Sequence, residues 1–270
     1  MTRIAECFAQ LRAKSKVGLI AYLTAGDPDP SLTVRLMHAL ARAGADIIEL
    51  GVPFSDPMAD GPVIQRAADR AVRKGVGLSD CLAMARQFRL DDSTTPLVLM
   101  GYANPIERMG VGVFVDSAKA AGVDGAIVVD YPPEECQEYV LALKNAQMDP
   151  IFLLAPTSTE KRIETVAASA GGFIYYVSLK GITGAGNLDV DDVAARLPAI
   201  RAHSKLPLAV GFGIRDGQSA RAVARVADAI VVGSRLVETI EAAGAAGNAD
   251  EVVNAAARLM GEIRVAIDSK

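Results

Sequence analysis

The sequence predicts an α/β protein, a (β/α)8 TIM barrel with an extra N-terminal helix and additional helices after strands 2 and 8. Three observations predict this fold. Eight short apolar runs alternate with segments of helical periodicity along 270 residues. Each run is continuously apolar, which is typical of parallel strands covered on both faces. The Gly-rich turn of a dinucleotide-binding sheet is missing after the first run, where Ala25-Gly26-Asp27 stands, so a closed barrel is favoured over an open sheet.

The eight predicted strands are short and follow one another along the whole chain. In order they span residues 18–23, 46–50, 97–102, 125–130, 150–155, 173–178, 207–211 and 229–232. No linker or low-complexity tract separates them. We therefore expect residues 1–270 to form a single barrel domain, which is an ordinary length for this architecture.

The helices are predicted from apolar residues three and four positions apart. They span residues 2–14, 30–43, a segment opening at 62, 79–90, a short helical region between 104 and 121, 134–145, 159–168, 190–202, 216–226, a short helix from 233–234, and 249–267. Asp29 is expected to cap the helix that has Pro30 at its first position, and Gly44 to end it. Pro62 opens the next helix, and Ser79 is expected to cap the one after that.

Composition and charge exclude several classes of function. The net charge of -4 gives no broad positive field, which argues against a nucleic-acid-binding surface. The first residues lack the apolar core of a secretory signal, and no apolar run reaches membrane-spanning length. A cytoplasmic location is therefore expected.

The cysteines and histidines do not form a metal or disulfide pattern. Cys7, Cys81 and Cys136 are widely spaced, and each lies in a predicted helix, so reduced and partly buried thiols are expected. His38 and His203 are the only histidines, and both lie in predicted helices. No metal site is expected, and acid–base chemistry is left to carboxylates, Tyr or Lys.

Carboxylates do stand where a barrel builds its active site, at the C-terminal ends of the strands. Glu49 is in the second predicted strand, in phase with Ile47, so its side chain is expected to point to one side of that strand near the barrel mouth. Burial there would raise its pKa toward neutrality, which suits proton transfer, whereas a structural salt bridge is the alternative. Asp60 follows in a loop that can fold over the mouth, and a helix N-cap is its alternative role. Asp56 is more typical of a turn residue.

Glycine-bearing loops at the last strand ends predict a phosphate site. Gly211-Phe212-Gly213 follows the seventh strand, and Gly233-Ser234 opens a helix after the eighth. Glycines let backbone N–H groups approach an anion, and a helix N-terminus attracts one. The loop after the sixth strand, with Gly181, Thr183, Gly184 and Gly186, could close over such a site. Plain turns are the alternative.

Apolar and aromatic residues at the strand ends could line a flat pocket, although each could equally be ordinary barrel core. They are Tyr22, Met100, Tyr102, Ile127, Val129, Tyr175 and Phe212. From residue types alone, we expect a lyase, isomerase or aldolase that acts on a phosphorylated and partly apolar substrate.

One motif is specific enough to indicate a family. The run from Glu49 to Gln65, ELGVPFSDPMADGPVIQ, resembles the signature of the tryptophan synthase α subunit. The resemblance covers essentially the whole chain. Its other segments are YLTAGDP from Tyr22, MGYANP from Met100, VDYPP from Val129, the stretch from Tyr175 that ends GITGA, GFGI from Gly211, and VGS from Val232.

The resemblance implies cofactor-free retro-aldol cleavage of indole-3-glycerol phosphate to indole and glyceraldehyde 3-phosphate. It makes Glu49 the acid–base group that protonates indole C3 and assists removal of the hydroxyl proton. It makes Asp60 the carboxylate that binds the indole N–H and stabilises positive charge. Tyr175 matches a position beside the substrate, and Thr183 matches a lid residue that closes onto Asp60. Gly184, Gly213, Gly233 and Ser234 match the phosphate-binding loops.

The resemblance also implies a partner. The family works as an α2β2 heterotetramer, in which the β subunit carries pyridoxal phosphate and receives indole. No cofactor is expected in this chain. The expected docking surface consists of exposed loop residues, namely Pro53, Phe54, Asp56, Pro57, Met58, Asn104, Pro132 and Pro133. Two positions depart from the enterobacterial pattern, because Tyr22 replaces a Phe and Leu179-Lys180 replaces a pair that contains Arg.

Two alternative functions remain open at this point. Lys180, just beyond the sixth strand, could serve a Schiff-base aldolase acting on a sugar phosphate, although a lysine in a Gly-rich loop is more typical of a solvated charge. The chain could also be a non-enzymatic subunit that only activates another protein. The intact pair of Glu49 and Asp60 argues against that alternative.

Overall fold

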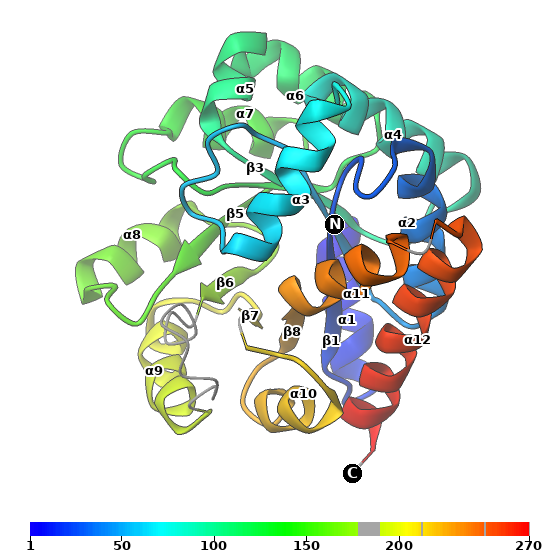
Figure 1. Ribbon diagram of the computed structural model, residues 1–270. Helices are drawn as coiled ribbons and strands as arrows, with labels where there is room; N and C mark the ends of the chain where they lie inside the picture. The colour runs from blue at the N-terminus through cyan, green and yellow to red at the C-terminus, as the bar shows by residue number, and fades with distance from the viewer. Residues whose placement is uncertain (178–189, 212, 246, 270) are drawn as a thin grey trace.

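The computed structural model describes residues 1–177, 190–211, 213–245 and 247–269. Its eight strands form a closed barrel in which each strand is parallel to both neighbours (Figure 1). The strands are β1 (Gly18–Thr24), β2 (Ile47–Gly51), β3 (Leu97–Gly101), β4 (Gly125–Val128), β5 (Asp149–Leu154), β6 (Ile174–Val177), β7 (Leu208–Gly211) and β8 (Ala229–Val232). The predicted (β/α)8 fold and every predicted strand are confirmed, with ends that differ by one or two residues.

Helices surround this barrel (Figure 1). They are α1 (Arg3–Ala13), the 3-10 turn η1 (Pro30–Leu32), α2 (Thr33–Arg42), α3 (Pro62–Arg73), α4 (Leu78–Asp91), α5 (Ala103–Met109), α6 (Val111–Ala120), α7 (Gln137–Asn145), α8 (Glu160–Ser169), α9 (Val190–His203), α10 (Gly217–Ala224), α11 (Ser234–Gly244) and α12 (Ala249–Asp268). The predicted extra helices after the second and eighth strands are α4 and α12.

Several predicted helix starts were wrong. Gly77, not Ser79, precedes the first turn of α4, and its N–H donates to the carboxylate of Asp80. The region after β3 is two helices, because Gly110 has a φ of 88° and interrupts the helical path. Helix α7 begins at Gln137 instead of Glu134, so Cys136 lies at its N-cap position and not inside it.

The thiols agree with the prediction of reduced cysteines. All three are free, with Cys81 and Cys136 buried and Cys7 partly exposed. In the parts of the chain that the structure describes, we found no helix long and apolar enough to cross a membrane.

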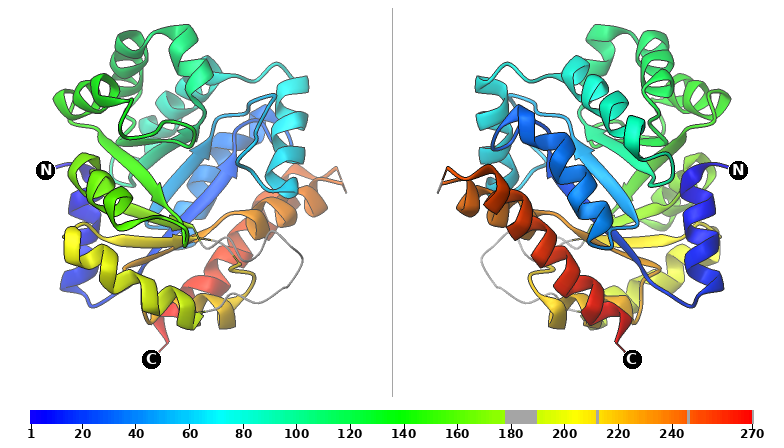
Figure 2. Two further views of the ribbon diagram at one scale, coloured as in Figure 1. Left: turned by 90° about the vertical axis from the view of Figure 1, so that its left-hand side faces the viewer. Right: turned by 90° about the vertical axis from the view of Figure 1, so that its right-hand side faces the viewer.

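The barrel has two apolar layers, one inside the strands and one between strands and helices. Alternate residues of each strand point inward, as the two-residue period requires. The inner core includes Ile20, Ile47 and Val98, and it is continuous with Ile4 and Phe8 of α1. Helix α1 therefore closes the end of the barrel where the strands begin, as Figure 2 shows.

Three aspartates fasten the strand starts at this closed end. Each lies directly before an even-numbered strand and accepts a 2.8 Å hydrogen bond from a backbone N–H near the start of the preceding strand. Each also pairs with an arginine from an outer helix, at 2.7 to 3.0 Å. The sets are Leu19–Asp46–Arg264, Leu97–Asp124–Arg89 and Leu208–Asp228–Arg201.

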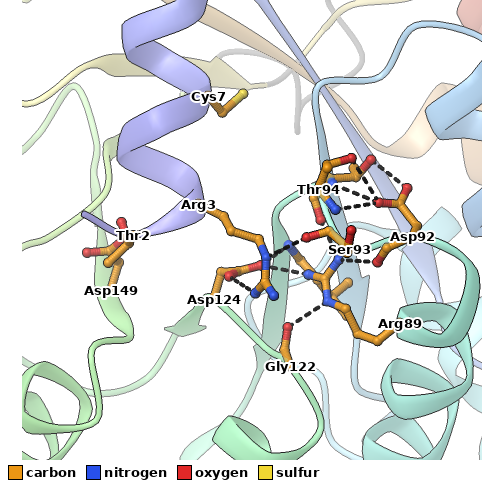
Figure 3. Close-up of polar contacts among 12 residues, drawn as sticks. Thr2, Arg3, Cys7, Arg89, Asp92, Ser93, Thr94, Gly122, Asp124 and Asp149 are labelled. Atoms are coloured by element: carbon orange, nitrogen blue, oxygen red, sulfur yellow. Dashed lines mark hydrogen bonds and ion pairs between the residues drawn. The ribbon is translucent and has the colours of Figure 1, made fainter.

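The Asp124 carboxylate has the most partners of the three among the described residues, and Figure 3 shows its surroundings. Its Oδ2 accepts from Leu97 N and from Arg89 Nη2, and its Oδ1 accepts from Arg3 Nη1 at 2.7 Å. Arg89 also donates to backbone carbonyls, including that of Gly122. This buried carboxylate therefore ties α1, α4 and strands β3 and β4 together beneath the barrel.

Asp124→Ala should lower the free energy of unfolding by about 3 kcal/mol or more, because it leaves the largely buried Arg89 charge and the buried Leu97 N–H without this partner. Urea unfolding at neutral pH measures the change. The matched control is Asp69→Ala, which removes an exposed i,i+4 pair with Arg73 on α3 and should cause little loss. Equal, small losses in both variants would contradict the bracing role of Asp124.

Candidate active site

Glu49 lies in the wall of the barrel near its open end. Its backbone pairs with Tyr22 on β1 and Val98 on β3, and it alternates with Ile47, so its side chain points inward. The residue is 0% exposed, and neither carboxylate oxygen has a hydrogen-bond partner among the described residues. Burial raises the pKa of Glu49 from 4.5 to about 8. The carboxyl is therefore held largely protonated at neutral pH.

Asp60 reaches the same site from the loop between β2 and α3. The hydroxyl of Tyr102 donates to its Oδ2 at 3.0 Å. Burial raises the pKa of Asp60 from 3.8 to about 6, although the Tyr102 hydrogen bond opposes the rise. The position before α3 belongs to Gly61, so the alternative role of Asp60 as the N-cap is wrong. Asp60 is left mainly ionised at neutral pH, in contrast to Glu49.

Two tyrosines complete the polar part of the site. Tyr22 and Tyr175 are so placed that their hydroxyls occupy the space beside Gly51 and Gly211. A Cβ on Gly51 would lie 2.3 Å from the Tyr22 hydroxyl oxygen, and a Cβ on Gly211 would lie 2.2 Å from the Tyr175 hydroxyl oxygen. Only glycine therefore fits at either position. Burial raises the pKa of both tyrosines, and the charges of Glu49 and Asp60 add to the effect. The tyrosines are therefore neutral neighbours of the two carboxyls.

Apolar side chains form the walls. Met100, Val129 and Leu153 are partly exposed members of the inner core at its open end. The predicted pocket residue Ile127 is 0% exposed and packs in the inner core below them. Sequence reasoning missed Leu153, although it alternates with Ile151 on β5. It also missed Ile64 of α3, which packs beside Tyr22 and Met100.

One of the predicted phosphate loops, at Gly233, lies next to this pocket. Gly233 immediately precedes α11, whose first residue is Ser234, and no side chain among the described residues caps that helix. A Cβ on Gly233 would lie 3.8 Å from Tyr22 Cβ, so this N-terminus adjoins the pocket through Tyr22. Gly213 has a φ of 77°, which favours glycine after β7. The predicted residues Thr183, Gly184, Phe212 and Lys180 lie outside the described residues.

Comparison with known proteins identifies the family. The family model described as "Tryptophan synthase alpha chain" matches residues 8–267. The tryptophan synthase alpha chain of Cupriavidus taiwanensis is 59% identical over 269 residues, which are 100% of both chains. That of Herminiimonas arsenicoxydans is 60% identical over 99% of this chain and 100% of its own. The chain belongs to the tryptophan synthase alpha chain family. Its similarity to the bacterial relatives spans the barrel and both terminal helices.

Solved structures agree with this assignment. Tryptophan synthase subunit alpha from Legionella pneumophila superposes with a TM-score of 0.94 at 43% identity, with 100% of both chains covered. A chain of tryptophan synthase from M. tuberculosis gives 0.87 at 34% identity, over 99% of this chain and 100% of that one. The alpha subunit of tryptophan synthase is a lyase that cleaves indole-3-glycerol phosphate to indole and glyceraldehyde 3-phosphate. That cleavage is the function of this chain, and its membership implies a beta subunit as partner.

The predicted docking residues are not all on the surface. Pro53 and Pro133 are buried in this chain, so the prediction that they are exposed was wrong. Asn104 is exposed, and Pro132 is partly exposed. Phe54, Asp56, Pro57 and Met58 line a surface hollow of about 530 Å³ against α3, and Met58 is 82% exposed. The remaining loop residues are thus accessible from outside the barrel.

One cluster among the described residues could hold a cation. Glu160 and Glu164 of α8 and His203 of α9 each place a donor atom within 4.8 Å of the others. All three are exposed on outer helices and are not among the groups at the barrel mouth. The acid–base geometry described above does not involve them.

Glu49→Gln should stabilise the fold at high pH. With the pKa of Glu49 raised from 4.5 to about 8, the folded state keeps a proton that the unfolded state releases across this window. Stability of the parent therefore falls as pH rises from about 4.5 to about 8. The variant should gain little at pH 5 and on the order of a few kcal/mol at pH 8.5 in urea unfolding.

Glu138→Gln on the exposed face of α7 is the matched control and should show no such gain. A Glu49→Gln variant that is no more stable than the parent at pH 8.5 would show that the buried carboxyl ionises without cost.

Proposed function

We propose that Glu49 and Asp60 divide the acid–base work of indole-3-glycerol phosphate cleavage in this chain. One observation carries the proposal. Two carboxyls share one barrel mouth, and burial raises their pKa values unequally, to about 8 for Glu49 and about 6 for Asp60. Near pH 7 one is an acid and the other an anion. Two carboxyls in different environments commonly take different roles.

In the first step, protonated Glu49 donates its proton to C3 of the indole ring. The ring then carries a positive charge that is shared with its nitrogen. Asp60, ionised and held on its loop, accepts a hydrogen bond from the indole N–H and stabilises that charge. A fixed anion in a dry pocket is an effective stabiliser because it needs little reorganisation.

In the second step, the bond between C3 and the side-chain carbon breaks, and its electron pair returns to the ring. The hydroxyl on that carbon becomes an aldehyde as its proton passes to the Glu49 carboxylate. Indole and glyceraldehyde 3-phosphate result, and Glu49 is again protonated. No group other than the substrate is consumed, so we propose that this chain needs no cofactor, and that pyridoxal phosphate belongs to the beta subunit only.

The pocket walls suit an aromatic substrate whose ring C3 faces Glu49 and whose N–H faces Asp60. Met100, Val129 and Leu153 offer an apolar surface, and neutral Tyr22 and Tyr175 flank the carboxyls. We assign Tyr175 to contact the substrate beside Glu49. Among the residues predicted by family resemblance, Thr183 is proposed as the lid residue that meets Asp60.

The substrate phosphate is proposed to bind at the N-terminus of α11, with Gly213 and Gly184 contributing from neighbouring loops. Gly233 and Ser234 stand where a helix presents unpaired N–H groups. Tyr22 lies between the N-terminus of α11 and Glu49. The N-terminus of α11 and Glu49 are therefore about two strand spacings apart, or roughly 10 Å. That span suits a molecule with a phosphate at one end and a ring at the other.

The alternatives have less support. A Schiff-base aldolase would need Lys180 as a desolvated nucleophile, and borohydride trapping with substrate should give no adduct with this chain. A purely activating subunit would have no reason to keep two carboxyls at unequal, raised pKa values.

The partner is proposed to be a beta subunit in an α2β2 heterotetramer, docked on Phe54, Asp56, Pro57, Met58, Asn104 and Pro132. The accessible hollow beside Met58 supports this surface. Adding beta subunit should raise indole formation and give a complex of two copies of each chain by light scattering. No change in rate or mass would refute the docking.

We also propose that residues 1–270 form one domain, because all eight strands close into one sheet. We further propose a cytoplasmic location.

Glu49→Gln and Asp60→Asn should each lower kcat for indole formation by at least about a hundredfold, since each loses a proton donor or a charge that acts in the transition state. The parent kcat/KM should follow a bell-shaped pH curve with limbs near 6 and 8.

Ser234→Glu should raise the KM for indole-3-glycerol phosphate, because the new carboxylate would repel the substrate phosphate.

Folding of each variant is checked by circular dichroism, and indole is measured directly. Turnover near the parent rate in Asp60→Asn would show that the charge of Asp60 is not needed. Turnover near the parent rate in Glu49→Gln would remove the proton-transfer role.

A further inference from the structure

Tyr102 holds the Asp60 loop from the neighbouring strand. It follows β3 directly, precedes the first turn of α5, and is 4% exposed. Its hydroxyl accepts a hydrogen bond from Ala59 N at 3.1 Å and lies 3.0 Å from Asp60 Oδ2. A single atom anchored on the rigid barrel thus contacts two consecutive residues of the loop.

The direction of these hydrogen bonds is fixed by their chemistry. A backbone N–H can only donate, so the Tyr102 oxygen acts as the acceptor for Ala59. The one hydroxyl proton remains for Asp60, and an ionised carboxylate can only accept. Tyr102 therefore donates to the carboxylate, and the bond favours the charged form of Asp60.

The ring of Tyr102 holds the other end of the same loop. Phe54 stacks on it with ring centroids 5.2 Å apart and an angle of 28° between the planes. From α3, Gln65 holds the loop backbone through the carbonyls of Pro57 and Asp60, at 3.3 Å and 2.9 Å. Gln65 thus fixes the backbone, but within the described part of the chain Tyr102 alone hydrogen-bonds the Asp60 carboxylate.

We propose that Tyr102 is the positioning residue of the reaction: its hydroxyl orients the Asp60 carboxylate and keeps it ionised, while its ring fixes the Phe54 end of the loop. This inference rests on the proposed role of Asp60. It assigns Tyr102 a function through Asp60 in place of the pocket-lining role that its apolar ring suggests.

The consequence for catalysis is specific. Burial alone would raise the pKa of Asp60 further, and a protonated Asp60 could not stabilise the cationic ring. The Tyr102 hydroxyl opposes burial, and so extends the pH range in which the carboxylate is charged. Loss of the hydroxyl should therefore affect activity most at the acidic side of the pH curve, which a purely structural role would not do.

The test is the pH dependence of kcat/KM for indole formation in Tyr102→Phe, from pH 5 to pH 9. The variant keeps the ring stack and loses only the hydroxyl. A hydrogen bond to a charged group corresponds to about one to two pKa units, so the acid limb should move upward by about one unit. The deficit should then be about fivefold larger at pH 6 than at pH 8.

Tyr139→Phe is the matched control. The Tyr139 hydroxyl is buried without a hydrogen-bond partner among the described residues, and Tyr139 packs on Phe114 away from the carboxyls. It should leave the acid limb in place. Phe54→Leu, which removes the stack and keeps the hydroxyl, should lower kcat without the one-unit shift.

An unchanged acid limb in Tyr102→Phe, or a loss equal at every pH, would overturn the inference and leave Tyr102 a packing residue. Asp60→Asn separates this failure from failure of the proposed function. If the parent limb near pH 6 vanishes in Asp60→Asn but is unmoved in Tyr102→Phe, only the role of Tyr102 is wrong. If Asp60→Asn keeps the limb and the rate, the role of Asp60 fails, and that of Tyr102 fails with it.

Discussion

The burial of the Glu49 carboxyl, which has no hydrogen-bond partner in the described part of the chain, is the constraint on which the site depends. A charge in the barrel wall would be strongly destabilising, so the group keeps its proton, and burial raises its pKa to about 8. The same burial makes it an acid near neutral pH. The surrounding barrel maintains this dry position, because α1 closes the far end and the aspartate pairs beneath the strands brace it.

Asp60 is held in a different way, and the difference produces its different ionisation. It lies on a loop between a strand and a helix, and it accepts a hydrogen bond from Tyr102, whereas none of the residues that the structure describes hydrogen-bonds the Glu49 carboxyl. One carboxyl is fixed by the rigid strand and stays neutral, whereas the other is held by Tyr102 and is charged. A retro-aldol cleavage needs one group that supplies a proton and one that stabilises the resulting cation, and this pair fits both needs.

Patterns within short segments of the sequence predict the strands and the side of a strand on which a residue lies. Continuous apolar runs placed the ends of all eight strands to within two residues, and the alternation of Glu49 with Ile47 placed both side chains on one side of the strand near the barrel mouth. Contacts between distant segments were not predictable in this way. The bond from Tyr102 to Asp60 joins residues 42 positions apart, and Ile64 reaches the pocket because α3 packs against the mouth of the barrel. Proline content indicated a turn at Pro53 but not its burial, and the start of α4 at Gly77 lacks the side-chain cap that sequence reasoning seeks.

Infrared difference spectroscopy of the protein across a pH titration tests the protonation of Glu49 most directly. We expect the band of a protonated, unbonded carboxyl at pH 7, lost with an apparent pKa near 8 and absent from Glu49→Gln. A spectrum with no such band at pH 7, or a band that is already lost before the rising pH reaches 6, would mean that Glu49 is ionised in the barrel at neutral pH. The proton donor assigned to the reaction would then be wrong.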